Sequence, residues 1–442
     1  MPDTPRTPTG STPPAGTPSA GTPPAVRSAD PGPAEPVIAV SLGGDMVPNT
    51  VPNTVPNTVP HTPPGAAAEP ALPAPVRVPP VVDVTALDWD AVHRAADPAA
   101  VRARLRDAVA RLTARLDQAD GPGFLFDADR AGPDDRAIRV AALDDDRPLW
   151  FVGDLHGDLL ALEAALALAR SADAAGEATE APPSAPRFVF LGDLFDDGGH
   201  GLEVLARVFE LLADDPASAC LVAGNHDEAL AWTGERFTAT VSPSDFVDRL
   251  NADLGDETAV RAGQLTVRLF ARAPRALFFP DGLLVAHAGF PLVDLHAELE
   301  AQGDFNDPRA LVDFAWVRLH PKARRKLPNR ASRGSQFGRE DWDDFCALAT
   351  RLGRPVTHLV RGHDHVEERW EVPPAYAQHP VLTTIALSRR LPRELFGPYV
   401  RVPTVARWVP GALPQVHRLH VPEALVRTLY PAETESAAEV DG

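Results

Sequence analysis

The chain has 442 residues and is poor in cysteine, in basic residues relative to acidic ones, and in long apolar runs. Cys220 and Cys346 are too few for a disulfide framework, which indicates a reducing cytoplasm. Lysine and arginine number 42 against 61 aspartates and glutamates, a net charge of −19. A general nucleic-acid binder needs a basic stripe, so we expect no nucleic-acid partner.

A membrane partner is not expected either. No apolar run reaches about 18 residues, which excludes a transmembrane helix. The first residues lack the basic-then-apolar pattern of a secretory signal, and the acidic balance argues against a polybasic membrane anchor.

Proline is abundant but unevenly spread. Of the 48 prolines, 22 lie in the first 80 residues, and residues 47–62 read VPNT-VPNT-VPNT-VPHT. Such a stretch has too few large apolar side chains to offset an ordering cost of about 1–2 kcal/mol per residue. We therefore predict that residues 1–85 form a disordered, partly polyproline II tail.

Residues 86–146 are predicted to be a helical lead-in. Asp97 before Pro98 is typical of a helix N-cap followed by proline at the first helical position. The following apolar residues recur at helical spacing and predict one buried face: Val101, Leu105, Val109, Leu112 and Leu116.

From residue 148 to about residue 387, short apolar runs alternate with helical patterns. The runs are residues 149–152, 188–191, 221–223, 283–286 and 358–360, each of the length of a buried strand. Helical patterns follow the first two runs, at residues 159–169 and 202–212. This βαβ alternation predicts an α/β fold in which polar residues after each strand meet at one edge of the sheet.

Those polar residues form five short strings. They are GDLHGD at 153–158, GDLFDDG at 192–198, GNHDE at 224–228, AHAG at 286–289 and RGHDH at 361–365. Carboxylate, amide and imidazole groups are the ligands that divalent metals of intermediate hardness prefer. Any one string is a weak signal, but five in succession after predicted strands indicate a metal site.

The set resembles the calcineurin-like metallophosphoesterases, and within them the phosphoprotein phosphatase branch. Trp316 after HAGF, and Arg333-Gly334 with Phe337-Gly338, resemble further features of that branch. The resemblance implies a β-sandwich flanked by helices over residues 147–390. Residues 391–442 are left as a C-terminal extension with an acidic end.

The resemblance also implies the ligands of two divalent metal ions. Asp154 and His156 would bind the first metal, and Asp193 would bridge both. Asn225, His287 and His363 would complete the second site. His365 fits the GH-x-H pattern of the wider family, in which the second histidine reaches the first metal. Mn²⁺ is expected by resemblance, with Fe²⁺ or Zn²⁺ as alternatives.

The implied chemistry is attack by a metal-bridging hydroxide on a phosphate ester. Two ions about 3.5–4 Å apart can hold the hydroxide and clamp the attacking and leaving oxygens. In the family, the histidine of GNH is the general acid, here His226, and Asp196 would orient it.

Two departures from the family pattern affect substrate binding. Asp197 stands where most members have arginine after the aspartate, so we expect weaker phosphate binding that relies on Arg333. Ser388-Arg389-Arg390 replaces the SAPNY stretch of the branch. A basic run at residues 322–326 contains both lysines of the chain and has the composition of a solvated face.

We therefore predict a bacterial Ser/Thr protein phosphatase-like enzyme acting on a phosphorylated protein or small molecule. One alternative is a hydrolase of dinucleoside polyphosphates or phosphodiesters, since the wider family shares these ligands. The other is a metal-stabilised interaction module without turnover.

Overall fold

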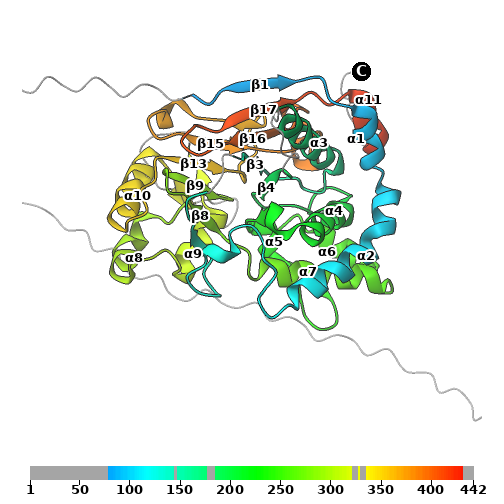
Figure 1. Cartoon of the computed structure of the whole chain (residues 1–442), viewed down its shortest axis with the longest axis horizontal. Coiled ribbons are helices and arrows are strands. Elements are labelled where there is room, and N and C mark those ends of the chain that lie inside the picture. The colour runs from blue at the N-terminus through cyan, green and yellow to red at the C-terminus, as the bar shows by residue number, and fades with distance from the viewer. Residues whose placement is uncertain (1–77, 144–146, 177–184, 321–326, 329–334, 432–442) are drawn as a thin grey trace, which may run out of the picture. The chain divides into compact units, whose positions relative to one another are not determined.

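The computed structural model describes residues 78–143, 147–176, 185–320, 327–328 and 335–431, all within one compact unit of the chain (Figure 1). In this described part, most strands belong to two six-stranded mixed sheets. The first has the order β1 (Val81–Val84), β17 (Gln415–Leu419), β16 (Thr404–Trp408), β3 (Leu149–Val152), β4 (Arg187–Phe190) and β5 (Ala219–Leu221). The second has the order β14 (Trp370–Glu371), β15 (Val381–Thr384), β13 (His358–Arg361), β9 (Leu283–Ala286), β8 (Ala276–Phe278) and β2 (Ala137–Arg139).

Each sheet contains a parallel trio of strands, and five of these six strands, all except β15, were predicted from apolar runs to within two residues at each end. β3, β4 and β5 pair in parallel in the first sheet, and β9, β13 and β15 do so in the second. The strands β3, β4, β9 and β13 are buried along their whole length, which explains why they read as continuous apolar runs.

The two sheets pack face to face around a buried cluster. Alternate residues of the strands supply it, as the period of two in a strand requires, because successive side chains point to opposite faces. Its members include Phe151, Val189, Leu277, Val285, Val360, Leu382 and Ala406. The predicted sandwich is confirmed.

Helices cover the outer faces of both sheets. A second cluster joins the first sheet to α1 (Trp89–Ala95), α2 (Pro98–Leu116), α3 (Leu159–Gly176), α4 (Gly201–Asp214), α6 (Asp245–Ala252), α7 (Glu257–Phe270) and α11 (Glu423–Leu429). A third joins the second sheet to α8 (His296–Gln302), α9 (Pro308–Trp316) and α10 (Arg339–Arg351). Figure 1 shows α8 and α10 beside the second sheet, and α3 and α4 beside the first.

Short strands complete the described structure. β6 (Ala231–Trp232) pairs with β7 (Phe237–Thr238), while β10 (Arg318–Leu319), β12 (Ser335–Phe337) and β11 (Leu327–Pro328) form a small sheet. The helix α5 (Asn225–Ala229) directly follows the turn after β5.

The expected N-cap and apolar face of the lead-in lie in α2, but residues 137–139, also placed in the helical lead-in, form β2 of the second sheet. The Asp97 side chain accepts hydrogen bonds from the backbone N–H groups of Ala99 and Ala100, and Pro98 is the first helical residue. The predicted apolar face is buried from Val101 to Leu112 and packs in the same cluster as α4, so the lead-in closes the core of the first sheet.

Two boundaries expected from the sequence are wrong. Residues 81–84, placed in the disordered tail, form β1, which pairs in parallel with β17. Residues 391–442, taken as an extension, supply β16 and β17, and β16 pairs directly with β3. Strand formation at these places depends on partners far along the chain, which local patterns do not reveal. The rest of the predicted tail, residues 1–77, lies outside the described residues, as do residues 432–442 of the acidic end.

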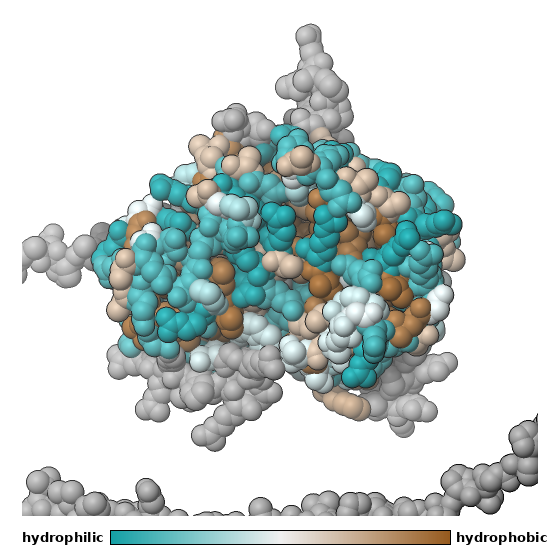
Figure 2. Space-filling view, turned by 90° about the horizontal axis from the view of Figure 1, so that it is seen from below, coloured by the Kyte–Doolittle hydropathy of each residue, from teal (hydrophilic) through white to brown (hydrophobic). Residues whose placement is uncertain are grey.

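In the described part of the chain, no helix combines the length and apolar character needed to cross a membrane. Figure 2 looks at the molecule from below the view of Figure 1 and shows hydrophilic residues over most of that face, with hydrophobic patches between them.

Candidate active site

The predicted site residues lie just beyond the ends of β3, β4, β5, β9 and β13. The first three strands belong to one sheet and the last two to the other. The expectation that these residues meet at the edge of one sheet is therefore wrong, because strand ends of both sheets contribute. An apolar run in the sequence does not indicate to which sheet its strand belongs. The residues that meet there are Asp154, His156, Asp193, Asp196, Asn225, His226, His287, His363 and His365.

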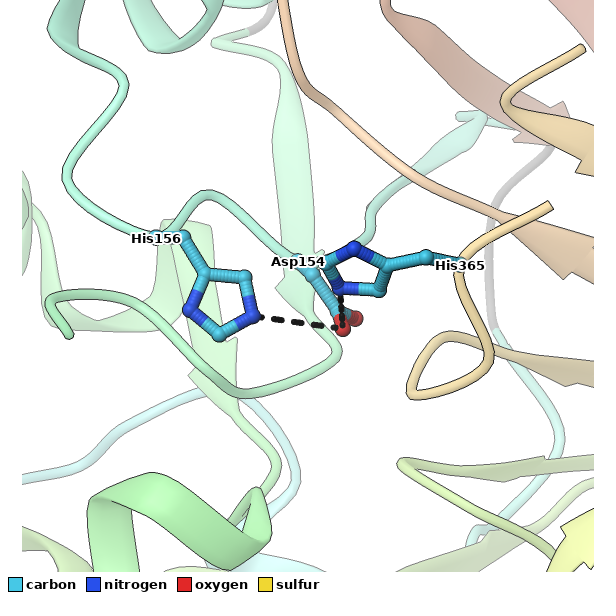
Figure 3. Close-up of side chains that lie close together, drawn as sticks. All are labelled: Asp154, His156 and His365. Carbon is cyan, nitrogen blue, oxygen red and sulfur yellow. Dashed lines mark ion pairs between the residues drawn. The ribbon is translucent and has the colours of Figure 1, made fainter. Parts of the chain in front are cut away.

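A first group of metal-ligand type consists of Asp154, His156 and His365. Asp154 Oδ2 lies 3.4 Å from His365 Nε2 and 3.9 Å from His156 Nε2. Figure 3 shows the two imidazoles reaching this carboxylate from separate loops. The side chains of Asp154 and His156 are fully buried, and that of His365 is 9% exposed. Three donor groups thus converge on one small volume.

A second group consists of Asp193, His287 and His363, with Asn225 beside it. His287 Nε2 lies 3.1 Å from both Asn225 Oδ1 and His363 Nδ1, and 3.4 Å from Asp193 Oδ2. All four residues are buried.

Asp193 connects the two groups through a single oxygen. Its Oδ2 atom lies 3.4 Å from His287 Nε2 in the second group and 3.9 Å from His156 Nε2 in the first. A carboxylate in this position can serve both groups, as a bridging ligand requires.

In three of the histidines, a hydrogen bond at Nδ1 determines that Nε2 is the nitrogen that faces the site. His156 Nδ1 lies 2.9 Å from the carbonyl of Asp196, and His287 Nδ1 lies 2.9 Å from that of Leu191. His365 Nδ1 lies 2.5 Å from the Glu394 carboxylate. Because a carbonyl or carboxylate accepts a proton there, each Nε2 presents its lone pair to the site, as in metal-binding histidines.

The donor set fits a divalent cation. The amide oxygen of Asn225 and a carboxylate oxygen of Asp193 both lie close to His287 Nε2. These atoms are all electron-pair donors, and a cation bound between them would balance the negative charge of the carboxylate. Although burial lowers it, the pKa of His287 is raised to about 9, mainly by the Asp193 carboxylate. Burial, and then the Arg393 charge, hold the pKa of His156 well below its ordinary value. His156 is therefore neutral and able to bind metal. His287 Nε2 lies beside the Asp193 carboxylate, a position that favours positive charge, which a bound cation would supply in place of a proton.

The backbone at these turns is unusual and holds the donors close together. His156, Asp193 and His363 all have positive φ angles, 42°, 54° and 69°, a region that non-glycine residues seldom adopt and that clusters at functional sites. A Cβ at Gly362 would lie 2.1 Å from Asp154 Oδ1, so only glycine allows this close approach.

Asp227, which was not among the residues expected at the site, joins the two turns that carry Asp193 and Asn225. Its carboxylate accepts hydrogen bonds from the backbone N–H groups of Asp193 at 2.7 Å, Gly224 at 3.0 Å and Leu194 at 3.1 Å. The adjacent GNH string was the available signal, but a carboxylate that binds only backbone has no recognisable spacing.

His226 and Asp196 form the predicted imidazole–carboxylate pair, with His226 Nδ1 2.9 Å from Asp196 Oδ2. The His226 backbone N–H donates to Asp193 Oδ1 at 3.0 Å, and its ring lies edge-on to that of His156. Burial lowers the pKa of His226, but the carboxylates of Asp193 and Asp196 outweigh burial and raise it. The protonated imidazole is thus stabilised beside the two metal-ligand groups.

Residues 388–390, which stand where the branch has SAPNY, make hydrogen bonds to the loops that carry site residues. Ser388 donates hydrogen bonds from its N–H and its hydroxyl to the Asp158 carboxylate. The Arg389 guanidinium donates to the carbonyls of His156 and Asp197. Although Ser388 and Arg389 differ from the family pattern, their hydrogen bonds thus hold these loops in place.

Two further residues that contact these groups come from residues 391–442, which were expected to be a C-terminal extension. Glu394 accepts from both terminal nitrogens of Arg369, at 2.9 and 2.8 Å, and contacts His365. Arg393 reaches the rings of His156 and His365. No motif surrounds either residue, so no local signal could have found them.

Two predicted features lie outside the described residues: Arg333, expected to bind phosphate, and the basic run at residues 322–326. Trp316 ends α9 and is partly buried.

A mixed α/β sandwich with two carboxylate–imidazole groups at its strand ends is typical of metal-dependent hydrolases. The family model for calcineurin-like phosphoesterases matches residues 147–367, half of the chain. The chain belongs to this family and is therefore a hydrolase; the family uses divalent metals. A search of curated proteins finds no significant match.

Solved structures with similar folds are distant in sequence. One is a protein serine/threonine phosphatase from Saccharomyces cerevisiae with similarity to human phosphatase PP5, 17% identical, with a TM-score of 0.44 over 73% of this chain and 89% of that one. A putative diadenosine tetraphosphatase is 17% identical, with a TM-score of 0.31 over 64% and 98%. A cold-active protein-tyrosine phosphatase of a psychrophile Shewanella species is 16% identical, with a TM-score of 0.36 over 62% and 80%.

Proposed function

We propose that the protein is a dimetal phosphomonoesterase of the Ser/Thr protein phosphatase type. The observation that carries the proposal is the position of Asp193 Oδ2 within 3.9 Å of a ring nitrogen of each group, with the His226–Asp196 pair alongside. A purely structural metal site would need neither the bridge nor the acid pair.

In this proposal, Asp154, His156 and His365 hold the first metal, and Asn225, His287 and His363 hold the second, with Asp193 shared. The oxygen and nitrogen donors suit Mn²⁺, Fe²⁺ and Zn²⁺, and we propose Mn²⁺. When bound, such a pair supplies an activated water nucleophile and charge stabilisation for phosphoryl transfer.

The protein's own contribution to ester cleavage is the proton for the leaving oxygen. In the protonated His226 ring, Nδ1–H donates to Asp196, so Nε2–H remains for the departing alkoxide. Asp196 is itself held by the N–H of Phe246, at 3.2 Å to its Oδ1. The carboxylate thus both orients the imidazole and stabilises its charged form.

The substrate class is tested by comparing a phosphoserine and phosphothreonine peptide panel with diadenosine tetraphosphate on the full chain loaded with Mn²⁺. We expect higher kcat/KM on the phosphopeptides, because His226 is placed to protonate an alkoxide, a poorer leaving group than a nucleotide. A preference for diadenosine tetraphosphate would replace the phosphatase proposal by the polyphosphate one. Turnover of neither would support the interaction module.

The remaining proposals concern location and partners. We propose a cytoplasmic enzyme whose partners are phosphorylated substrates, without nucleic acid or membrane. Cys220 and Cys346 are both buried free thiols, which suits a reducing compartment.

A further inference from the structure

An arginine from outside the part matched by the family model reaches the first metal-ligand group. Arg393 lies in a short 3₁₀ turn, Pro392–Glu394. Its Nη2 atom is 3.3 Å from His156 Nε2 and 3.4 Å from His365 Nε2, and its Nη1 atom is 3.5 Å from Asp197 Oδ2. The side chain of Arg393 is 42% exposed, so its guanidinium stands at the boundary between the buried ligands and solvent.

The backbone around Arg393 is firmly held. The neighbouring Glu394 carboxylate accepts from the buried Arg369 guanidinium and from the N–H of Leu391. Arg369 also donates to the carbonyls of Arg389 and Val400, one on each side of the turn. Arg393 therefore projects from a fixed turn, which favours a specific role over that of a mobile surface charge.

The position of this guanidinium indicates what it binds. Arg393 Nη2 is within hydrogen-bond distance of His156 Nε2 and His365 Nε2, the two nitrogens that would bind the first metal, so the guanidinium would stand beside that metal when it is bound. A guanidinium beside divalent cations is unfavourable unless an anion lies between them. An oxyanion with several oxygens would satisfy both, because the planar fork of arginine matches phosphate bidentately.

Asp197, expected from the sequence to repel phosphate, is paired within the structure. Its carboxylate faces Arg393, its N–H donates to the Asp245 carboxylate at 2.5 Å, and its carbonyl accepts from Arg389 at 2.9 Å. Its side chain is only 6% exposed, and its backbone has a positive φ of 69°. The carboxylate is thus directed at Arg393 instead of at the substrate.

We propose that Arg393 is a phosphate-binding residue and that Asp197 positions it, so that the pair takes the place of the arginine that follows this aspartate in the family motif. This inference rests on the proposed function only in assuming that the bound anion is a phosphoryl group. The sequence-based expectation is thereby reversed: replacing Asp197 with arginine should weaken phosphate binding, because it removes the partner of Arg393 and places a second cation beside it.

The test uses the full Mn²⁺-loaded chain and the variants Arg393→Met, Arg393→Lys, Asp197→Asn and Asp197→Arg. The control is Arg427→Met, which removes an arginine that is 61% exposed on α11. Calorimetry measures the Kd of inorganic phosphate, kinetics give KM and kcat for p-nitrophenyl phosphate, and elemental analysis gives the metal content.

We expect Arg393→Met to raise the Kd of phosphate and KM by roughly 10–100-fold with metal content unchanged, since hydrogen bonds to a charged group are worth about 1.5–3 kcal/mol. Arg393→Lys should lose less, and both Asp197 variants should raise KM more than they lower kcat. Unchanged phosphate affinity in Arg393→Met, metal loss in that variant, or tighter binding in Asp197→Arg would overturn the proposal. If the wild type lacks phosphatase activity but Arg393→Met still weakens phosphate binding, the proposed function fails and the phosphate site stands.

Discussion

Asp193→Asn should abolish the paired metal site while leaving the fold intact. The substitution keeps the shape of the side chain, and the amide oxygen can still accept the N–H of His226. It removes the negative charge that lies near a ring nitrogen of each group. Because altering even an outer-sphere partner costs about 10–100-fold in metal affinity, we expect loss of more than about 10²-fold here. We expect kcat/KM to fall by at least about 10³-fold. This is the largest loss typical of removing one hydrogen-bond donor that stabilises a transition state.

The matched control is Asp120→Asn, which removes the same charge from an exposed position. Metal affinity measured by competition with a chelating dye, together with circular dichroism, separates loss of metal from loss of fold. An Asp193→Asn variant that binds two metals with wild-type affinity would show that this carboxylate is not the bridge.

His226→Gln should lower kcat by about 10²–10⁴-fold on phosphoserine peptides, with a much smaller effect on KM. The loss should be smaller on p-nitrophenyl phosphate, because its phenolate leaves without first being protonated. His379→Gln, on a partly exposed histidine, serves as the control. Equal losses on the two substrates would contradict a role in protonating the leaving group.

The pH dependence follows from the same pair. A general acid works while protonated, so kcat/KM should fall as the pH rises through the pKa of His226. Burial lowers that pKa, and the carboxylates of Asp193 and Asp196 raise it; when Asp193 binds metal, the hydrogen bond from Nδ1 to Asp196 is the raising contribution that remains. Asp196→Asn removes one of the two carboxylates, so the basic limb should move to lower pH. If the basic limb of the kcat/KM profile stays at the same pH in Asp196→Asn, the group that titrates is not His226.

The strand-end strings were readable from the sequence because each combines a buried apolar run with ligand-type residues one or two positions later. This local order let Asp154, Asp193 and His287 be placed with their strands before any tertiary contact was known. His365 was the weakest member of the set, and its place rests on a tertiary contact, the 3.4 Å approach to Asp154 Oδ2.

What the sequence could not reveal depends on contacts between distant segments. β1 exists only because β17 pairs with it, and its own four residues are mostly exposed. Arg393 and Glu394 follow no motif; their importance arises from hydrogen bonds to His156, His365 and Arg369. Asp197 was interpreted as a repelling charge because its partner lies 196 residues further along the chain (393 − 197).

The most direct test of the dimetal proposal is elemental analysis of the full chain purified without added metal, followed by chelation and reconstitution with Mn²⁺, Fe²⁺ or Zn²⁺. The two ligand groups joined by Asp193 predict about two equivalents of divalent metal per chain. Phosphatase activity should disappear with the metal and return when the second equivalent binds. Absence of metal together with failure of every ion to restore turnover would contradict the account.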